Sequence, residues 1–394
     1  MQRSERPKLS LKERDRRWNG IRQEMLTEGL DCLVIIGKSG MWDSHSANVR
    51  YVTQVFWESM AVFPLNESPT VFIWGAHHIE WFLDYQDWVT DIRSGRWHWA
   101  ESAANRVKEL GCHKGRIGLV GLGGWSEPEG IWPHQLYLDL EKNLPGAPLV
   151  NATGILERLR LVKSEEEISM LEEAAKIGDL AVAALIHSAR AGKKDCEVFA
   201  DVIQSMLAAG SEFPPMLIWE SGKTPFHARY YPNIRMLGKG EVIINEISPR
   251  WCGYWGHPHQ PVSIGEPSDT ELLHMFDIVH ESFETGLRSL VPGATIEEVD
   301  EAFGKPILKA GYTWIHPCIH GIGLQISEPP RTSVAKMSPA SPEGLKLKEG
   351  MVFAVEPIVA TKERTKAIPL GDTVVVTPSG GRRLGSRQLK LIKV

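Results

Sequence analysis

The first 155 residues alternate between amphipathic segments with helical spacing and short apolar runs. Apolar residues recur every three to four positions in 11–29 and in 99–111, and this spacing predicts a helix in each segment. Short apolar runs bounded by Gly, Pro and Asp predict buried strands. The predicted strands are 31–38, 68–75 and 115–121. Helices that alternate with strands indicate an α/β layer.

A long helix opens the second part of the chain. Ser164 is followed three residues later by Glu167, which is the capping-box pattern, and acidic residues fill the first turn. Helices then alternate with apolar strands up to the C-terminus, with Gly and Pro at the breaks. We therefore predict a two-domain α/β protein with domains 1–155 and 156–394 and a hinge around residues 154–163.

Composition and charge exclude several classes of protein. The chain has 394 residues and a net charge of 44 − 49 = −5 without long blocks of like charge, so we expect neither nucleic acid nor a membrane surface as a partner. No apolar run approaches 18 residues, and the charged N-terminus lacks the apolar core of a secretory signal. Five scattered cysteines without a CxxC motif indicate reduced thiols in a cytoplasmic protein.

Tryptophan is unevenly distributed, because ten of the 14 lie before residue 150. Indole rings bury large apolar areas and are enriched at interfaces. Two interpretations remain open: a Trp-rich core, or an aromatic surface that meets a partner subunit or a ligand.

Metal-binding or proton-transferring side chains occur at four places in the second half of the chain. The first is His227, and the third is the pair His316 and His320 before a Gly-rich turn. The second place holds Glu246 and His257, which would face each other if residues 249–252 form a hairpin turn.

The fourth place is Glu356, which ends an apolar strand before a proline. A buried glutamate is costly unless it is paired or metal-bound, so it needs a partner. Taken singly, each of these residues also has an ordinary interpretation as a hydrogen-bonded structural histidine or an ion-pair partner. Their order and spacing together favour a site.

That order resembles the pita-bread family, which includes creatinase, prolidase, aminopeptidase P and methionine aminopeptidase. The matching segments are LERLRLVKSEEEISMLEEAA, GEVIINEI, GYWGH, HPCIHGIGL, GMVFAVEP and GDTVVVTPSGG. The first 155 residues are similar in size and pattern to the amino-terminal domain of creatinase and prolidase. The resemblance implies a creatinase-type α/β domain followed by a pita-bread catalytic domain.

The resemblance also implies a metal site, with departures. Peptidases of the family bind two metal ions through Asp, Asp, His, Glu and Glu. The corresponding positions here are Glu246, His257, His320, Glu356 and Gly371. Glycine has no side chain, and Asp372 beside it should point to the opposite face of its strand. We therefore expect one divalent ion (zinc, iron or manganese) held by Glu246, His257, His320 and Glu356.

The resemblance to creatinase implies a metal-free alternative with the same surrounding residues. In that version a histidine at the position of His227 acts as both base and acid, and His320 and Glu356 complete the pocket. The resemblance places an anchor for a substrate carboxylate at Arg331, and the histidine motif also suggests His316 and Ser327 for substrate binding. In both versions His227, His320 and Glu356 are the catalytic candidates.

We thus predict a divergent hydrolase of the aminopeptidase P and prolidase type that cleaves a C–N bond in a small carboxylate-bearing substrate. The alternatives are a metal-independent amidinohydrolase, a lyase, and a peptidase-like binding module without catalysis. The resemblance further implies a homodimer.

Overall fold

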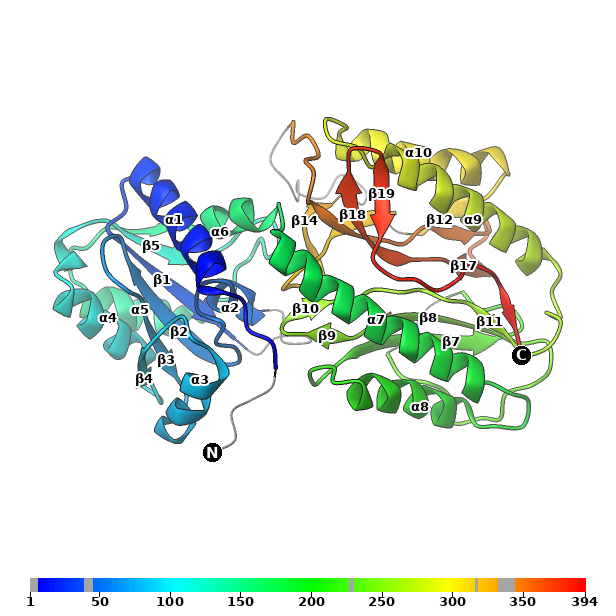
Figure 1. Ribbon diagram of the computed structural model, residues 1–394, viewed down its shortest axis with the longest axis horizontal. Helices are drawn as coiled ribbons and strands as arrows, with labels where there is room; N and C mark the ends of the chain where they lie inside the picture. Colours follow the sequence, from blue (N-terminus) through cyan, green and yellow to red (C-terminus); the bar gives the residue numbers. More distant parts are fainter. Residues whose placement is uncertain (1–5, 39–44, 227–229, 316–317, 332–343) are drawn as a thin grey trace. The chain divides into compact units, whose positions relative to one another are not determined.

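The computed structural model describes residues 6–38, 45–226, 230–315, 318–331 and 344–394 (Figure 1). Its contacts divide the chain into two compact units, 1–161 and 162–394. The boundary expected after residue 155 lies inside helix α6 (Thr153–Arg160), which belongs to the first unit.

The first unit is built on one six-stranded sheet. Its strands are β1 (Cys32–Gly37), β2 (Ser59–Pro64), β3 (Thr70–Ile73), β4 (Asp91–Ser94), β5 (Ile117–Val120) and β6 (Leu149–Asn151). They lie in the order β4-β3-β2-β1-β5-β6, and β1 pairs parallel with β5 but antiparallel with β2. The three strands predicted from the apolar runs are confirmed as β1, β3 and β5, whereas β2, β4 and β6 were not predicted.

Helices cover both faces of this sheet. They are α1 (Leu11–Glu28), α2 (Ala47–Thr53), α3 (Ile79–Tyr85), α4 (Trp99–Glu109), α5 (His134–Asn143) and α6, with short 3-10 turns at Ala76–His78 and Cys112–Lys114. Val62 of β2 belongs to the core cluster under α4 and α5. Phe63 points to the other face, because successive strand residues alternate, and its ring contacts Trp18 of α1. The two predicted helices, α1 and α4, are confirmed.

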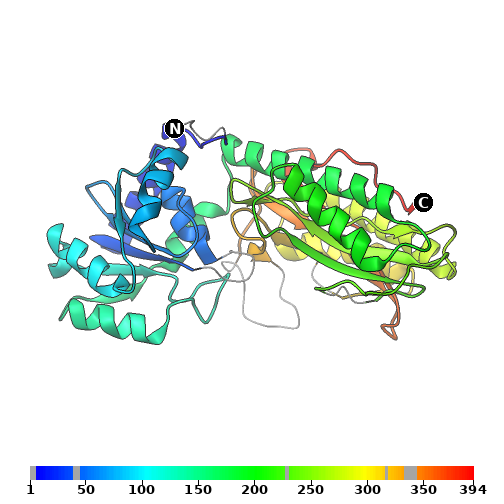
Figure 2. The same ribbon diagram turned by 90° about the horizontal axis from the view of Figure 1, so that it is seen from below.

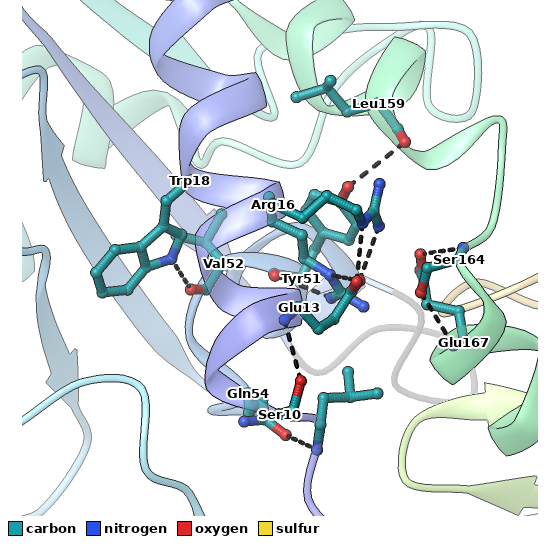
Figure 3. Close-up of polar contacts among 12 residues, drawn as sticks. Ser10, Glu13, Arg16, Trp18, Tyr51, Val52, Gln54, Leu159, Ser164 and Glu167 are labelled. Carbon is teal, nitrogen blue, oxygen red and sulfur yellow. Dashed lines mark hydrogen bonds and ion pairs between the residues drawn. The ribbon is translucent and has the colours of Figure 1, made fainter.

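The start of α1 carries a buried ionic cluster (Figure 3). Ser10 caps the helix by accepting a hydrogen bond from the backbone N–H of Glu13. The Glu13 carboxylate accepts hydrogen bonds from the guanidinium groups of Arg16 and Arg17 at 2.7–2.8 Å. Glu13 and Arg17 are almost fully buried, so the pair fixes this helix against the rest of its unit.

Among its described residues, the second unit contains four long helices. They are α7 (Glu165–Ser188), α8 (Asp195–Ala208), α9 (Glu271–Ser289) and α10 (Ile296–Lys309). The capping box predicted at Ser164 and Glu167 is confirmed, with both reciprocal hydrogen bonds formed (Figure 3). Within the described ranges, every helix is too short or too polar to span a bilayer.

The strands in the described part of this unit form four sheets. One is β20-β11-β8-β7, from Ile392–Lys393, Val262–Ser263, Val242–Ser248 and Met216–Gly222. Another is β14-β13-β15-β18-β19, from Glu328–Arg331, Ile319–Gly321, Val352–Val355, Asp372–Thr377 and Gly380–Arg383. A third is β12-β16-β17, from Thr313–Trp314, Ile358–Ala360 and Ala367–Pro369, and the fourth is the hairpin of β9 (Arg250–Trp251) and β10 (Tyr254–Trp255).

Helices α7 and α8 lie side by side and share a core with β7, β8 and β11, whereas α9 and α10 pack together on the β16, β17 and β19 side (Figures 1 and 2). The hairpin expected after β8 is present. Its turn lies at Cys252 and Gly253, both with positive φ, slightly later than the predicted centre. The chain therefore returns alongside β8 and brings residue 257 back toward residue 246.

Candidate metal centre

Side chains from four segments converge in the second unit. Glu246 lies on β8, and His257 and His259 lie in the extended segment between β10 and β11. His320 lies on β13, and Glu356 follows the last residue of β15. Residues separated by more than 100 positions thus share one site.

Backbone hydrogen bonds hold these segments in register. The N–H of Ile247 donates to the carbonyl of Pro258 at 3.0 Å, which ties β8 to the segment after the hairpin. The N–H of Glu356 donates to the carbonyl of Cys318 at 2.8 Å, and β13 pairs with β15. The positions of the converging side chains are therefore fixed by strand pairing.

Glu356 is the centre of the cluster. Its Oε2 lies 3.1 Å from Nε2 of His257 and 3.2 Å from Nε2 of His259, and its Oε1 lies 3.3 Å from Nε2 of His320. Oε1 of Glu246 lies 3.4 Å from Nε2 of His257. One ligand atom each from Glu246, His257, His259 and Glu356 lies within 4.8 Å of the others.

Hydrogen bonds on the outer side orient two of the imidazoles. Nδ1 of His320 donates to the carbonyl of Gly321 at 2.9 Å, and Nδ1 of His257 pairs with Oγ of Ser248 at 3.0 Å. A ring nitrogen anchored in this way turns the opposite nitrogen inward, which is the usual support of a metal-binding histidine. Both Nε2 atoms accordingly face Glu356.

Burial and mutual charge shift the pKa values of the cluster. Burial, opposed by His257 and assisted by Glu356, raises the pKa of Glu246 to about 7. Burial also disfavours the charged form of Glu356, but His320, His257 and His259 outweigh it and hold the pKa of that carboxyl well below its usual range. Burial opposes the charge on His320, yet the Glu356 carboxylate prevails and raises the pKa of this imidazole.

These residues fit a divalent transition metal ion. Imidazole nitrogens and carboxylate oxygens are its common protein ligands, and here several point at one small region. Nε2 of His259 is buried and makes no hydrogen bond with any described residue, although it faces a carboxylate oxygen. A coordination bond would satisfy such an atom.

The side chain of Asp372, next to Gly371, points away from the cluster, as its place in the strand predicts. Gly371 immediately precedes β18, and the carboxylate of Asp372 turns away to Arg383 and Arg387 at 2.8 Å and 3.0 Å. Asp372 is buried and is committed to these two guanidinium groups. It therefore does not supply the ligand that Gly371 lacks.

The predicted substrate-binding residues have different outcomes. Arg331 pairs directly with His320 across β13 and β14, so the two side chains start from one face of the sheet. Ser327 is half-buried in the turn before β14. His227 and His316 lie outside the described residues.

A cavity of about 400 Å³ opens beside the cluster. Glu246, His259, Glu356 and Asn245 give it a polar side. Its remaining lining is Ile218, Phe226, Tyr230, Ile244, Ile315, Ile358 and Pro369. This volume and mixed lining suit a small organic molecule.

Sequence reasoning missed His259. The signal was present, because His257 and His259 are two positions apart in an extended segment and such residues point to the same side. The resemblance assigns only position 257 to the metal and gives position 259 no role.

Family models and relatives match nearly the whole chain. The model of metallopeptidase family M24 matches residues 169–378, and that of the creatinase/prolidase N-terminal domain matches residues 17–162. An Xaa-Pro dipeptidase of Pyrococcus furiosus is 29% identical over 241 residues, which cover 60% of this chain and 67% of the relative. An uncharacterised peptidase of Bacillus subtilis is 26% identical over 360 residues, covering 91% and 96%.

Solved structures show the same architecture. An X-Pro aminopeptidase of Thermotoga maritima superposes with a TM-score of 0.80 at 23% identity, over 96% of this chain and 99% of that one. The prolidase of Pyrococcus horikoshii gives a TM-score of 0.78 at 22% identity, over 96% and 100%. These matches confirm the predicted creatinase-type α/β domain followed by a pita-bread domain.

Proposed function

The chain belongs to metallopeptidase family M24, and from this premise we propose that it is a metal-dependent hydrolase that cleaves a C–N bond in a small carboxylate-bearing molecule. The observation that carries the proposal is the convergence of imidazole and carboxylate groups beside a small cavity. The dipeptidase and peptidase relatives support amide-type bonds as the substrate class.

Glu246, His257, His320 and Glu356 would hold one divalent ion, either zinc, iron or manganese. Such an ion supplies a Lewis acid that polarises a carbonyl group and lowers the pKa of water toward neutrality. The side chains have complementary tasks. Ser248 and the Gly321 carbonyl keep the imidazoles of His257 and His320 oriented, so the site does not reorganise when substrate enters.

Proton transfer requires a group that does not bind the ion. Glu246 borders the cavity, and burial raises its pKa to about 7 while no ion is bound, but as a ligand its carboxylate would be ionised and would hold the ion. His320 would bind the ion through Nε2, and its Nδ1 proton is donated to the carbonyl of Gly321. The resemblance therefore leaves His227 to take a proton from water and deliver it to the leaving nitrogen, so that one proton passes from water to the amine product.

Arg331 would bind the substrate carboxylate. A guanidinium presents two parallel N–H groups to a carboxylate, and Arg331 lies opposite His320 in the strand pair. The isoleucine-rich wall of the cavity then accommodates the apolar part of the substrate.

We also propose that the protein forms a homodimer through its first unit. Trp57, Trp74, Trp81 and Trp97 of that unit are between 45% and 78% exposed, and large exposed aromatic side chains favour an interface. Light scattering at micromolar concentration should give twice the chain mass. A monomeric mass would overturn this part of the proposal.

The test of the enzymatic proposal is a substrate panel. Dipeptides and N-acyl amino acids are compared with the same amides lacking the carboxylate, before and after chelation and metal return. We expect turnover of the carboxylated amides that chelation abolishes, and a KM about tenfold or more higher in Arg331→Lys. Activity that survives complete chelation would instead support the metal-independent creatinase-like reaction, and elimination products would support a lyase.

A further inference from the structure

We propose that His259 is itself a metal ligand, that it occupies the place left by the missing side chain at Gly371, and that the site holds a single ion in a nitrogen-rich shell. The inference rests on the proposed function only in assuming that a metal binds at this cluster. It adds a residue that the spacing of the motifs does not predict, and it gives the expected single ion a structural reason.

The ring of His259 and a side chain at position 371 would compete for the same space. His259 and Gly371 face each other in an antiparallel bridge and exchange both backbone hydrogen bonds, at 3.0 Å and 3.2 Å. A Cβ atom added at Gly371 would lie 2.7 Å from Cδ2 of His259 and 2.8 Å from the carbonyl oxygen of Val355. The imidazole therefore fills the volume that a side chain at position 371 would use, and each excludes the other.

The ring of His259 also points toward the other ligand atoms. Nε2 of His259 points at Oε2 of Glu356, 3.2 Å away, and the residue is only 3% exposed. This nitrogen has no hydrogen bond within the described part of the chain. A neutral Nε2 that faces a carboxylate oxygen brings two electron pairs together, so this contact needs a proton or a cation between the two atoms, and a metal ion bound by both would supply it.

The segment that carries His259 is also anchored on its other side. The Asn245 side chain donates to the carbonyl of Gln260 at 2.6 Å and accepts from the N–H of Gln260 at 3.0 Å. Two pairs of hydrogen bonds thus hold this backbone, one between His259 and the backbone of Gly371 and one between the next residue, Gln260, and the side chain of Asn245. The ring of His259 is positioned by the fold and not by side-chain freedom.

Charge and ligand type give the stoichiometry and the metal class. Glu246 and Glu356 carry at most two negative charges, which balance one dication, and Asp372 is paired with arginines. A second dication would be buried without compensation. Among the imidazoles, His257 and His259 belong to the group of converging ligand atoms and His320 faces Glu356 beside it; imidazole ligands favour zinc or iron(II) over manganese, which prefers oxygen ligands.

Metal binding itself provides the test. The full-length protein is stripped, and Zn(II) and Mn(II) affinities are measured by competition with a chelating indicator for the wild type, His259→Ala, His259→Asp and the control His274→Ala. His274 is exposed on α9 and lies outside the cluster. We expect one ion per chain, a loss of about 10² in Zn(II) affinity for His259→Ala, and no change for the control.

The aspartate variant should shift the preference from Zn(II) toward Mn(II), because it exchanges a nitrogen ligand for an oxygen ligand. Should a variant fail to fold, pulsed electron paramagnetic resonance on Cu(II)-loaded wild-type protein still counts the coordinated imidazoles, and three are expected. Two ions per chain, two imidazoles, or wild-type Zn(II) affinity in a folded His259→Ala protein would each overturn the inference. Metal binding through His259 without any amide turnover would leave it standing and overturn the proposed function instead.

Discussion

Two buried polar clusters, one in each unit, show opposite ways of managing charge. Near the start of α1, Glu13 is surrounded by donors of its own chain. The guanidinium of Arg17 binds Glu13 at 2.7 Å and the carbonyl of Tyr51 at 3.0 Å, and it lies over the rings of Tyr51 and Trp88. Arg16 adds two further hydrogen bonds to Glu13.

The metal-centre cluster is built from groups that mostly accept. Glu246 and Glu356 present carboxylate oxygens, and His257, His259 and His320 direct Nε2 inward. In both clusters burial disfavours the charged form of the glutamate. Glu13 is stabilised by arginines, which do not lose their protons, whereas Glu356 faces imidazoles, which do. A buried carboxylate whose hydrogen bonds are all supplied by arginines therefore supports the fold. A buried group of carboxylates and imidazoles that point at one another is instead suited to binding a cation.

Removing the carboxylate of Glu356 should damage the metal-centre cluster more than any other single change. Glu356→Gln keeps the size of the side chain but removes the charge that three imidazoles face. We expect kcat/KM to fall by about 10³ or more, because loss of an outer-shell partner alone typically costs 10–100-fold. Steady-state kinetics with elemental analysis of the folded variant would measure this. Retained metal and near-normal turnover would show that Glu356 is structural, like Glu13.

The converse change in the first unit should affect stability and not chemistry. Glu13→Gln leaves the buried guanidinium of Arg17 without its counter-charge, so the free energy of unfolding should fall by about 3 kcal/mol. Denaturant unfolding followed by tryptophan fluorescence measures the loss. The kcat of the folded variant should equal that of the wild type, and a large fall in kcat would contradict the assignment of this cluster to the fold alone.

The two clusters should also give opposite pH dependences of stability. Burial raises the pKa of Glu13, but Arg16 and Arg17 outweigh it and lower the pKa below 4.5, so its stabilisation is present above about pH 4.5 and is lost as the pH falls through the folded value. Glu246 has a raised pKa of about 7, so in metal-free protein stability is lost as the pH rises from about 4.5 to about 7.

Matched variants separate these contributions. Glu13→Gln should remove the acid-side loss, and Glu246→Gln should remove the loss between about pH 4.5 and pH 7. Unfolding free energies measured from pH 3 to pH 8 in the presence of a chelator test both. Identical pH profiles for the wild type and Glu246→Gln would contradict the raised pKa.

Removing the one hydrogen bond that orients His257 should have the mildest effect on metal binding. Ser248→Ala removes the partner of Nδ1 of His257 at 3.0 Å and leaves every ligand in place. We expect metal affinity to fall about tenfold, since an outer-shell contact orients the ring without holding the ion. Competition with a chelating indicator measures the loss, and Ser205→Ala on α8 is the control. An unchanged affinity would show that strand pairing alone fixes His257.

Local pattern determined much of this protein. The amphipathic spacing of α1 and α4, the apolar runs of β1, β3 and β5, and the capping box of Ser164 and Glu167 depend on residues close in sequence. The order of acidic and histidine motifs likewise predicted the pita-bread fold. Gly371 could be identified as a position without a ligand because the absence of a side chain is a property of the residue itself.

Only the tertiary structure decided what fills that position. The bridge between His259 and Gly371 joins residues more than 100 positions apart, and no local pattern specifies which side chain will occupy the space beside a distant glycine. The pairing of Asp372 with Arg383 and Arg387 has the same origin. Sequence determines which chemical groups are available and which faces of an element they share, whereas strand pairing between distant segments determines which of those groups meet.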